Sequence, residues 1–89
     1  MSEYCEMWME MQKKNEFRVA LFIPEGLDTP EGINQLVIEN PSEQRRLFVS
    51  DWFSGIIDAK KFMNKIEHFY NGLGVKFLSF REIRKPLVL

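Results

Sequence analysis

The side chains that could take part in catalysis are few, and no known spacing brings them together. The chain has one histidine, His68, and one cysteine, Cys5. A histidine can act as a general base and a cysteine thiolate as a nucleophile, but on the polar face of a helix His68 is more simply a solvated residue. No HExxH, GxSxG, GxxxxGKS/T, GxGxxG or CxxC motif occurs in the sequence. We therefore expect a protein that is not an enzyme and holds no cofactor.

Four sulfur-bearing side chains near the N-terminus could form a soft-metal site. Cys5, Met7, Met9 and Met11 occupy alternate positions, so a strand would place all four on one face. Thiolate and thioether ligands suit Cu(I). Methionine also fills irregular gaps in a hydrophobic core, and neither a histidine nor a second cysteine accompanies the run. We expect these side chains to belong to the core and to bind no metal.

Basic residues occur in adjacent pairs, and some of them line up on one helical face. The pairs are Lys13-Lys14, Arg45-Arg46, Lys60-Lys61 and Arg84-Lys85. Lys61, Lys65 and His68 follow the spacing i, i+4 and i+7, and like charges at this spacing destabilise a helix by about 0.2–0.5 kcal/mol. This candidate basic helix face could contact a phosphate or an acidic protein surface. The simpler interpretation is a solvated lysine face.

The helix that carries this basic face is the clearest element in the sequence, and we predict it over residues 54–71. Ser54 or Asp51 can cap its first turn, and Gly72 with Gly74 can end it. One apolar stripe follows the helical period, and its members are Ala59, Phe62, Met63, Ile66, Phe69, Tyr70 and Leu73. Such a stripe predicts that one face of the helix packs on a sheet.

Four further segments are rich in β-branched and aromatic residues, which favour strands. They span residues 17–23, 33–39, 45–50 and 75–83. The turn-forming Asn40-Pro41 predicts that the second and third of them pair as a hairpin. The acidic segment between Pro24 and Gly32 predicts a surface loop that could meet a basic partner, and its spacing does not match a calcium loop.

Residues 3–14 fit either a helix or a strand. As a strand, a turn at residues 14–16 would place Trp8 opposite Phe22 and the methionines opposite Val19, Leu21 and Ile23. We favour this hairpin. The expected fold is a single α+β domain over residues 1–89, with an antiparallel four- to five-stranded sheet and the helix on one face. In chain order, the elements are then four strands, the helix and a fifth strand. If residues 3–14 are helical instead, the order is a helix, three strands, the second helix and a last strand.

The strands carry apolar side chains on both faces, although one helix covers only one. Facing the helix we expect Val19, Leu21, Ile23, Leu36, Ile38, Leu47 and Val49. Pointing away we expect Trp8, Phe22, Val37 and Phe48, interleaved with Arg18 and Arg46. Two-sided apolarity indicates that both faces are covered. The N-terminal segment, a second copy of the chain or another macromolecule could provide the second cover, and Trp8, Phe22, Phe48, Arg18 and Arg46 form the candidate interface.

Composition narrows the choice of function. The 89 residues have a formal net charge of −1, with 45% hydrophobic and 28% charged residues, which is ordinary globular composition. This charge gives no bulk attraction to nucleic acid or to an anionic membrane, and no apolar run approaches the ~20 residues that span a bilayer. The N-terminus lacks an apolar signal segment and a single cysteine fits a reducing compartment, so we expect a cytoplasmic protein.

We therefore expect a small binding or adaptor protein that acts through protein–protein contacts as a homodimer. The alternative is a single-stranded nucleic-acid-binding module, in which Trp8, Phe22 and Phe48 stack bases and Arg18 and Arg46 contact the backbone. A small enzyme that uses Cys5 or His68 is the third hypothesis.

Overall fold

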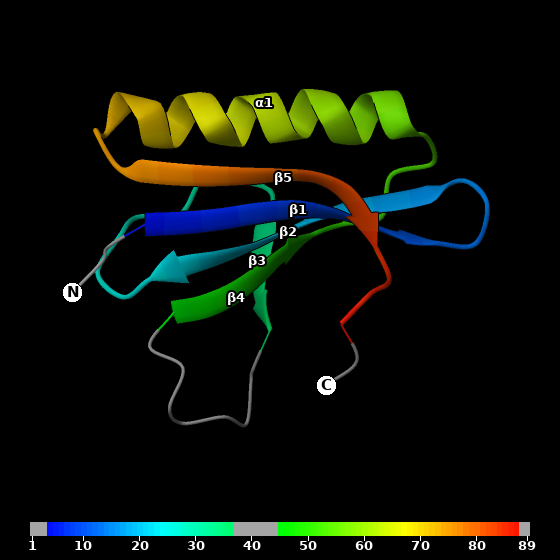
Figure 1. Ribbon diagram of the computed structural model, residues 1–89, viewed down its shortest axis with the longest axis horizontal. Helices are drawn as coiled ribbons and strands as arrows, with labels where there is room; N and C mark the ends of the chain where they lie inside the picture. Colours follow the sequence, from blue (N-terminus) through cyan, green and yellow to red (C-terminus); the bar gives the residue numbers. More distant parts are fainter. Residues whose placement is uncertain (1–3, 37–44, 88–89) are drawn as a thin grey trace.

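The described part of the chain, residues 4–36 and 45–87 of this computed structural model, forms a five-stranded sheet with one helix packed on it (Figure 1). In chain order the elements are β1 (Tyr4–Gln12), β2 (Glu16–Pro24), β3 (Ile33–Leu36), β4 (Arg45–Ser50), α1 (Ile56–Gly72) and β5 (Lys76–Arg84). The α+β prediction is confirmed, and the N-terminal segment is a strand. The alternative, in which residues 3–14 form a helix, is wrong for residues 4–12.

The sheet is mixed, with the strand order β3-β4-β2-β1-β5. Our expectation of a purely antiparallel sheet was wrong, because β5 pairs with β1 in parallel. The 17-residue helix is about 25 Å long and returns the chain to the end of the sheet where β4 began. The strand after the helix therefore runs in the same direction as β4 and β1, as in other crossover connections.

The β1–β2 hairpin was predicted, but its register was not. Met7 pairs with Leu21 and Trp8 with Ala20, whereas we expected Trp8 opposite Phe22. Gln12 pairs with Glu16, so the turn consists of residues 13–15 and lies one residue earlier than expected. Moving the turn by one residue shifts the register by two. The side chains therefore keep the faces that their alternation predicted.

The β3–β4 hairpin is confirmed by the pairing of Ile33 with Ser50 and of Leu36 with Leu47. Strand β4 also pairs with β2, where Phe48 lies opposite Leu21. The predicted turn at Asn40-Pro41 and the predicted strand residues Val37, Ile38 and Glu39 lie outside the described residues.

Helix α1 begins two residues later than predicted. Phe53 pairs with Phe17 through two backbone hydrogen bonds of 2.9 and 2.7 Å, which keeps the chain extended just before the helix. The N-cap is Gly55 and it makes no side-chain capping bond, so the predicted caps Ser54 and Asp51 were wrong. At the other end the helix stops beside Gly74, whose φ of 72° is the left-handed conformation that glycine adopts easily.

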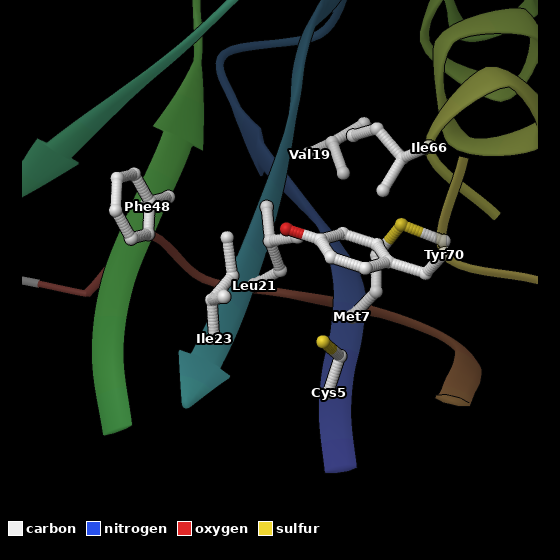
Figure 2. Packing of buried hydrophobic residues seen from close by; sticks show 8 residues of the cluster. All are labelled: Cys5, Met7, Val19, Leu21, Ile23, Phe48, Ile66 and Tyr70. Atoms are coloured by element: carbon white, nitrogen blue, oxygen red, sulfur yellow. The ribbon is translucent and has the colours of Figure 1, made fainter. Parts of the chain in front are cut away.

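The main core lies between α1 and the sheet (Figure 2). From the helix, Ile66 and Tyr70 point toward the strands and are almost fully buried. The sheet supplies Cys5, Met7, Val19, Leu21, Ile23 and Phe48. Phe48 was predicted on the other face, and it lies on the helix side because its partner Leu21 does.

Three residues predicted to face the helix lie on the opposite face, which we call the second face. Leu36, Leu47 and Val49 pack there with Trp8, Ala20, Phe22 and Phe80. The error has a clear cause in β4, where Leu47, Phe48 and Val49 are consecutive apolar residues. Alternation alone cannot say which of them points inward, and the pairing with β2 decides it.

Candidate functional site

The second face contains a buried carboxylate. Glu10 is fully buried, and its carboxylate accepts hydrogen bonds from Trp8 Nε1 at 2.9 Å, Arg18 Nε at 2.8 Å and the backbone N–H of Leu87 at 3.3 Å. A buried charge of this kind is tolerated because it is paired and hydrogen-bonded. The bond from Leu87 also shows that the segment after β5 lies over this face, so the chain covers part of it by itself.

The aromatic residues of the second face are packed against one another and against arginines. Trp8 is only 3% exposed, and its ring centroid lies 5.3 Å from that of Phe22. The Arg84 guanidinium lies 5.1 Å from the Trp8 ring and 4.9 Å from the Phe80 ring, at cation–π distance. Trp8 therefore has little surface left on which a base could stack.

The candidate interface predicted from the sequence is only partly brought together. Trp8, Arg18 and Phe22 share the second face, as expected from their pairing. Phe48 and Arg46 lie on the helix side instead, since they pair with Leu21 and Ile23 of β2. These five side chains therefore do not form one exposed platform.

Arg46 holds the loop between β2 and β3. Its Nη2 donates to the backbone oxygens of Leu27 at 3.0 Å and Pro24 at 3.4 Å, and its guanidinium lies 5.1 Å from the Phe48 ring. Tyr70 of α1 forms a second tether, because its hydroxyl donates to the backbone oxygen of Asp28 at 2.9 Å. Burial raises the pKa of Tyr70 far above its usual value, so this hydroxyl remains a donor.

This tethered loop and α1 enclose an open groove of about 550 Å³, which we call the α1 groove. It is lined by Thr29, Pro30, Glu31, Phe62, Lys65, Ile66, His68 and Phe69. Lys65 and His68, two members of the basic helix face predicted from the sequence, are exposed at its rim. The third member, Lys61, is also exposed, one helical turn before Lys65.

Sequence reasoning missed two parts of these sites. Glu10 was not singled out, although its cross-strand partner is Arg18, and this opposite-charge pair becomes visible only in the correct register. The loop wall of the α1 groove was predicted as a loop, but nothing in the sequence indicated that residues 29–31 lie beside the helix.

The structure places Cys5 and His68, either of which the enzyme hypothesis could use, in different surroundings. Cys5 is fully buried in the main core, and burial raises the pKa of its thiol to about 11, so it is protonated at neutral pH. His68 is exposed at the rim of the α1 groove. Met7 and Met9 are buried, whereas Met11 is 40% exposed. Within residues 4–36 and 45–87, no cluster of three or more His, Cys, Asp or Glu side chains is arranged to hold a metal ion.

Comparison with protein-family models, with curated proteins and with solved structures found no significant match. In the part of the chain that the structure describes, α1 is too short and too polar to span a bilayer.

Proposed function

We propose that the chain is a non-enzymatic binding protein that acts through protein–protein contacts, and that its partner is a second copy of itself. The observation that supports this proposal is β5, a nine-residue strand at the edge of the sheet. No strand of the described residues pairs with its outer edge. A long edge strand offers unpaired backbone donors and acceptors to another strand.

The side chains along β5 also favour association. Leu78 is 39% exposed on the second face, and Leu87, in the segment that follows the strand, is 42% exposed. At the opposite edge of the sheet, the described part of β3 has only four residues, and Asn34 and Gln35 are exposed and polar. Among the described residues, β5 is therefore the edge that combines the longer backbone with the more apolar surface.

One antiparallel register of two β5 strands is complementary in charge. The register of β5 against β1 shifts between Ser79 and Ile83. With Ser79 on the two-fold axis and no such shift along the outer edge, Lys76 lies opposite Glu82 of the second copy and Leu78 lies opposite its Phe80. Opposite-charge and apolar cross-strand pairs each contribute roughly 0.2–1 kcal/mol. A register centred on Phe80 would instead place Lys76 opposite Arg84, which is repulsive. The isologous pairing centred on Ser79 is therefore the one that we propose.

Sedimentation velocity tests this proposal with matched leucine variants. We expect the wild-type chain to form a dimer. Leu78→Glu should raise the dissociation constant of this dimer by about tenfold or more, because the substitution places two carboxylates in an apolar contact. Leu73→Glu is the control, since Leu73 is 52% exposed at the C-terminal end of α1 and not in β5. A wild-type monomer, or a dimer that Leu78→Glu leaves unchanged, would contradict the proposal.

A charge-swap experiment tests the register separately. Lys76→Glu and Glu82→Lys should each weaken the dimer by about 2- to 30-fold, because two such pairs form across the axis and each contributes ~0.2–1 kcal/mol. The double variant Lys76→Glu/Glu82→Lys should recover most of the affinity that either single variant loses, and the remaining loss reflects the ion pair between Glu82 and Arg84 (2.8 Å) that Glu82→Lys removes. Failure of the double variant to recover would rule out the register centred on Ser79.

A further inference from the structure

The α1 groove has the size and lining of a small-ligand site. Its volume of about 550 Å³ lies within the ~300–1,000 Å³ of typical ligand pockets. Phe62, Ile66 and Phe69 supply its apolar surface from the helix, and residues 29–31 form the facing wall. Ile66 is only 1% exposed, so it forms the floor of the groove.

The facing wall is held in place by the core of the protein. The Tyr70 hydroxyl binds the backbone oxygen of Asp28 at 2.9 Å, and Arg46 binds that of Leu27 at 3.0 Å. At the far end of the wall Gly32 has a φ of 93°, and a Cβ atom there would lie 2.9 Å from the Phe62 ring. These contacts anchor the loop on both sides of residues 29–31, so the groove exists before any ligand binds. A preformed site saves the free energy of ordering a loop on binding.

The charges at the rim are arranged unevenly. Lys65 and His68 both line the helix wall, whereas Glu31 lines the loop wall. Lys65 also follows Lys61 at the spacing i, i+4, which is unfavourable for an isolated helix. The rim therefore attracts one anionic group toward α1, and Glu31 disfavours a second anionic group on the other side.

We infer that the α1 groove binds a small amphiphilic carboxylate, with an apolar body against Phe62, Ile66 and Phe69 and a single anionic end at Lys65 and His68. The matching features are the apolar floor, the preformed walls and the basic side chains on the helix wall only. This site is separate from the edge of β5, so it does not depend on self-association.

Titration of ¹⁵N-labelled protein with decanoate, followed by NMR, tests the inference directly. We expect decanoate to shift the amide signals of residues 29–31 and 62–69. Decan-1-ol has a similar apolar body without the charge, and it should bind about 1.5- to 5-fold more weakly, as expected for the loss of one exposed ion pair worth about 0.2–1 kcal/mol. Equal affinity for the alcohol, or shifts confined to other parts of the chain, would overturn the inference.

Three variants assign the affinity to the groove. Lys65→Glu should weaken decanoate binding by about three- to tenfold. Lys60→Glu is the matched control, because Lys60 lies on the side of α1 that faces Met9 and Ile83, and it should leave binding nearly unchanged. Glu31→Gln should tighten binding, since it removes the opposing carboxylate. Equal losses in both lysine variants, or weaker binding by Glu31→Gln, would contradict the proposed orientation of the ligand.

A last variant blocks the groove without touching its charges. Thr29 is exposed on the loop wall, so Thr29→Trp places a large ring at the opening and should abolish the shifts. Unchanged thermal unfolding would show that the fold is intact. Full decanoate binding by a folded Thr29→Trp protein would overturn the inference. Because none of these residues lies in β5, a monomeric protein that binds decanoate would reject the dimer and keep the groove site.

Discussion

Removal of the Glu10 carboxylate is expected to destabilise the protein more than any surface substitution. The Glu10 side chain is 0% exposed and that of its partner Arg18 is 12% exposed. Glu10→Ala removes a charge-assisted hydrogen bond worth about 1.5–3 kcal/mol and leaves the buried Trp8 N–H without its acceptor, at a further cost of about 1–3 kcal/mol. Breaking one side of a buried ion pair costs about 3–5 kcal/mol in other proteins. We therefore expect the free energy of unfolding to fall by about 3–5 kcal/mol.

A small domain has only about 5–15 kcal/mol of stability, so Glu10→Ala can leave too little for the protein to fold. Glu10→Gln is the second variant, because it perturbs the site less. It keeps the shape and one acceptor oxygen but loses the charge, so we expect a loss of about 1–3 kcal/mol. Urea unfolding followed by tryptophan fluorescence measures both variants. Trp8 donates to Glu10, and the Arg18 guanidinium lies 4.6 Å from the Trp52 ring, so both tryptophans report on this site.

A double-mutant cycle shows whether the loss comes from the ion pair. Glu10→Gln and Arg18→Met should show a coupling free energy of about 1–3 kcal/mol. Glu25→Gln, in the exposed loop after β2, is the control and should stay within about 0.5 kcal/mol of wild type. If both Glu10 variants unfold like this control, or if the cycle shows no coupling, the account of the second face is refuted.

Three further substitutions test the core and the loop. Burial raises the pKa of Cys5 to about 11 in the folded protein, against an ordinary value of 9.0. The contribution of the protonated thiol to the free energy of unfolding is therefore complete below pH 9 and is lost as the pH rises through 11. Urea titrations at pH 8 and pH 10 should show wild type losing about 1 kcal/mol relative to Cys5→Ala. Tyr70→Phe removes one loop tether and should cost about 0.5–1.5 kcal/mol, with faster hydrogen exchange in residues 27–31; unchanged exchange would refute the tether. Gly32→Ala should cost about 1–3 kcal/mol more than Gly26→Ala in thermal unfolding, because both have positive φ but only Gly32 lies against Phe62; equal losses would argue against that contact.

Local sequence signals determined the elements of this protein. Alternation in β1 and β2 and the helical period of α1 predicted the type of each, because these patterns follow from the two backbone geometries themselves. The spacing of Lys65 and His68 likewise predicted that they share one face of the helix. Boundaries shifted by one or two residues where a tertiary contact intervened, as the Phe17–Phe53 bridge does before α1.

Pairings between distant segments were decided only by the tertiary structure. The parallel β5, the position of β4 beside β2 and the inward orientation of Phe48 all depend on which strands meet. Which strands pair depends on the free energy of the whole sheet, and a short stretch of sequence does not carry that information. For the same reason Glu10 appears in the sequence as an ordinary glutamate. Only the fold surrounds it with Trp8, Arg18 and Leu87 and buries its carboxylate on the second face.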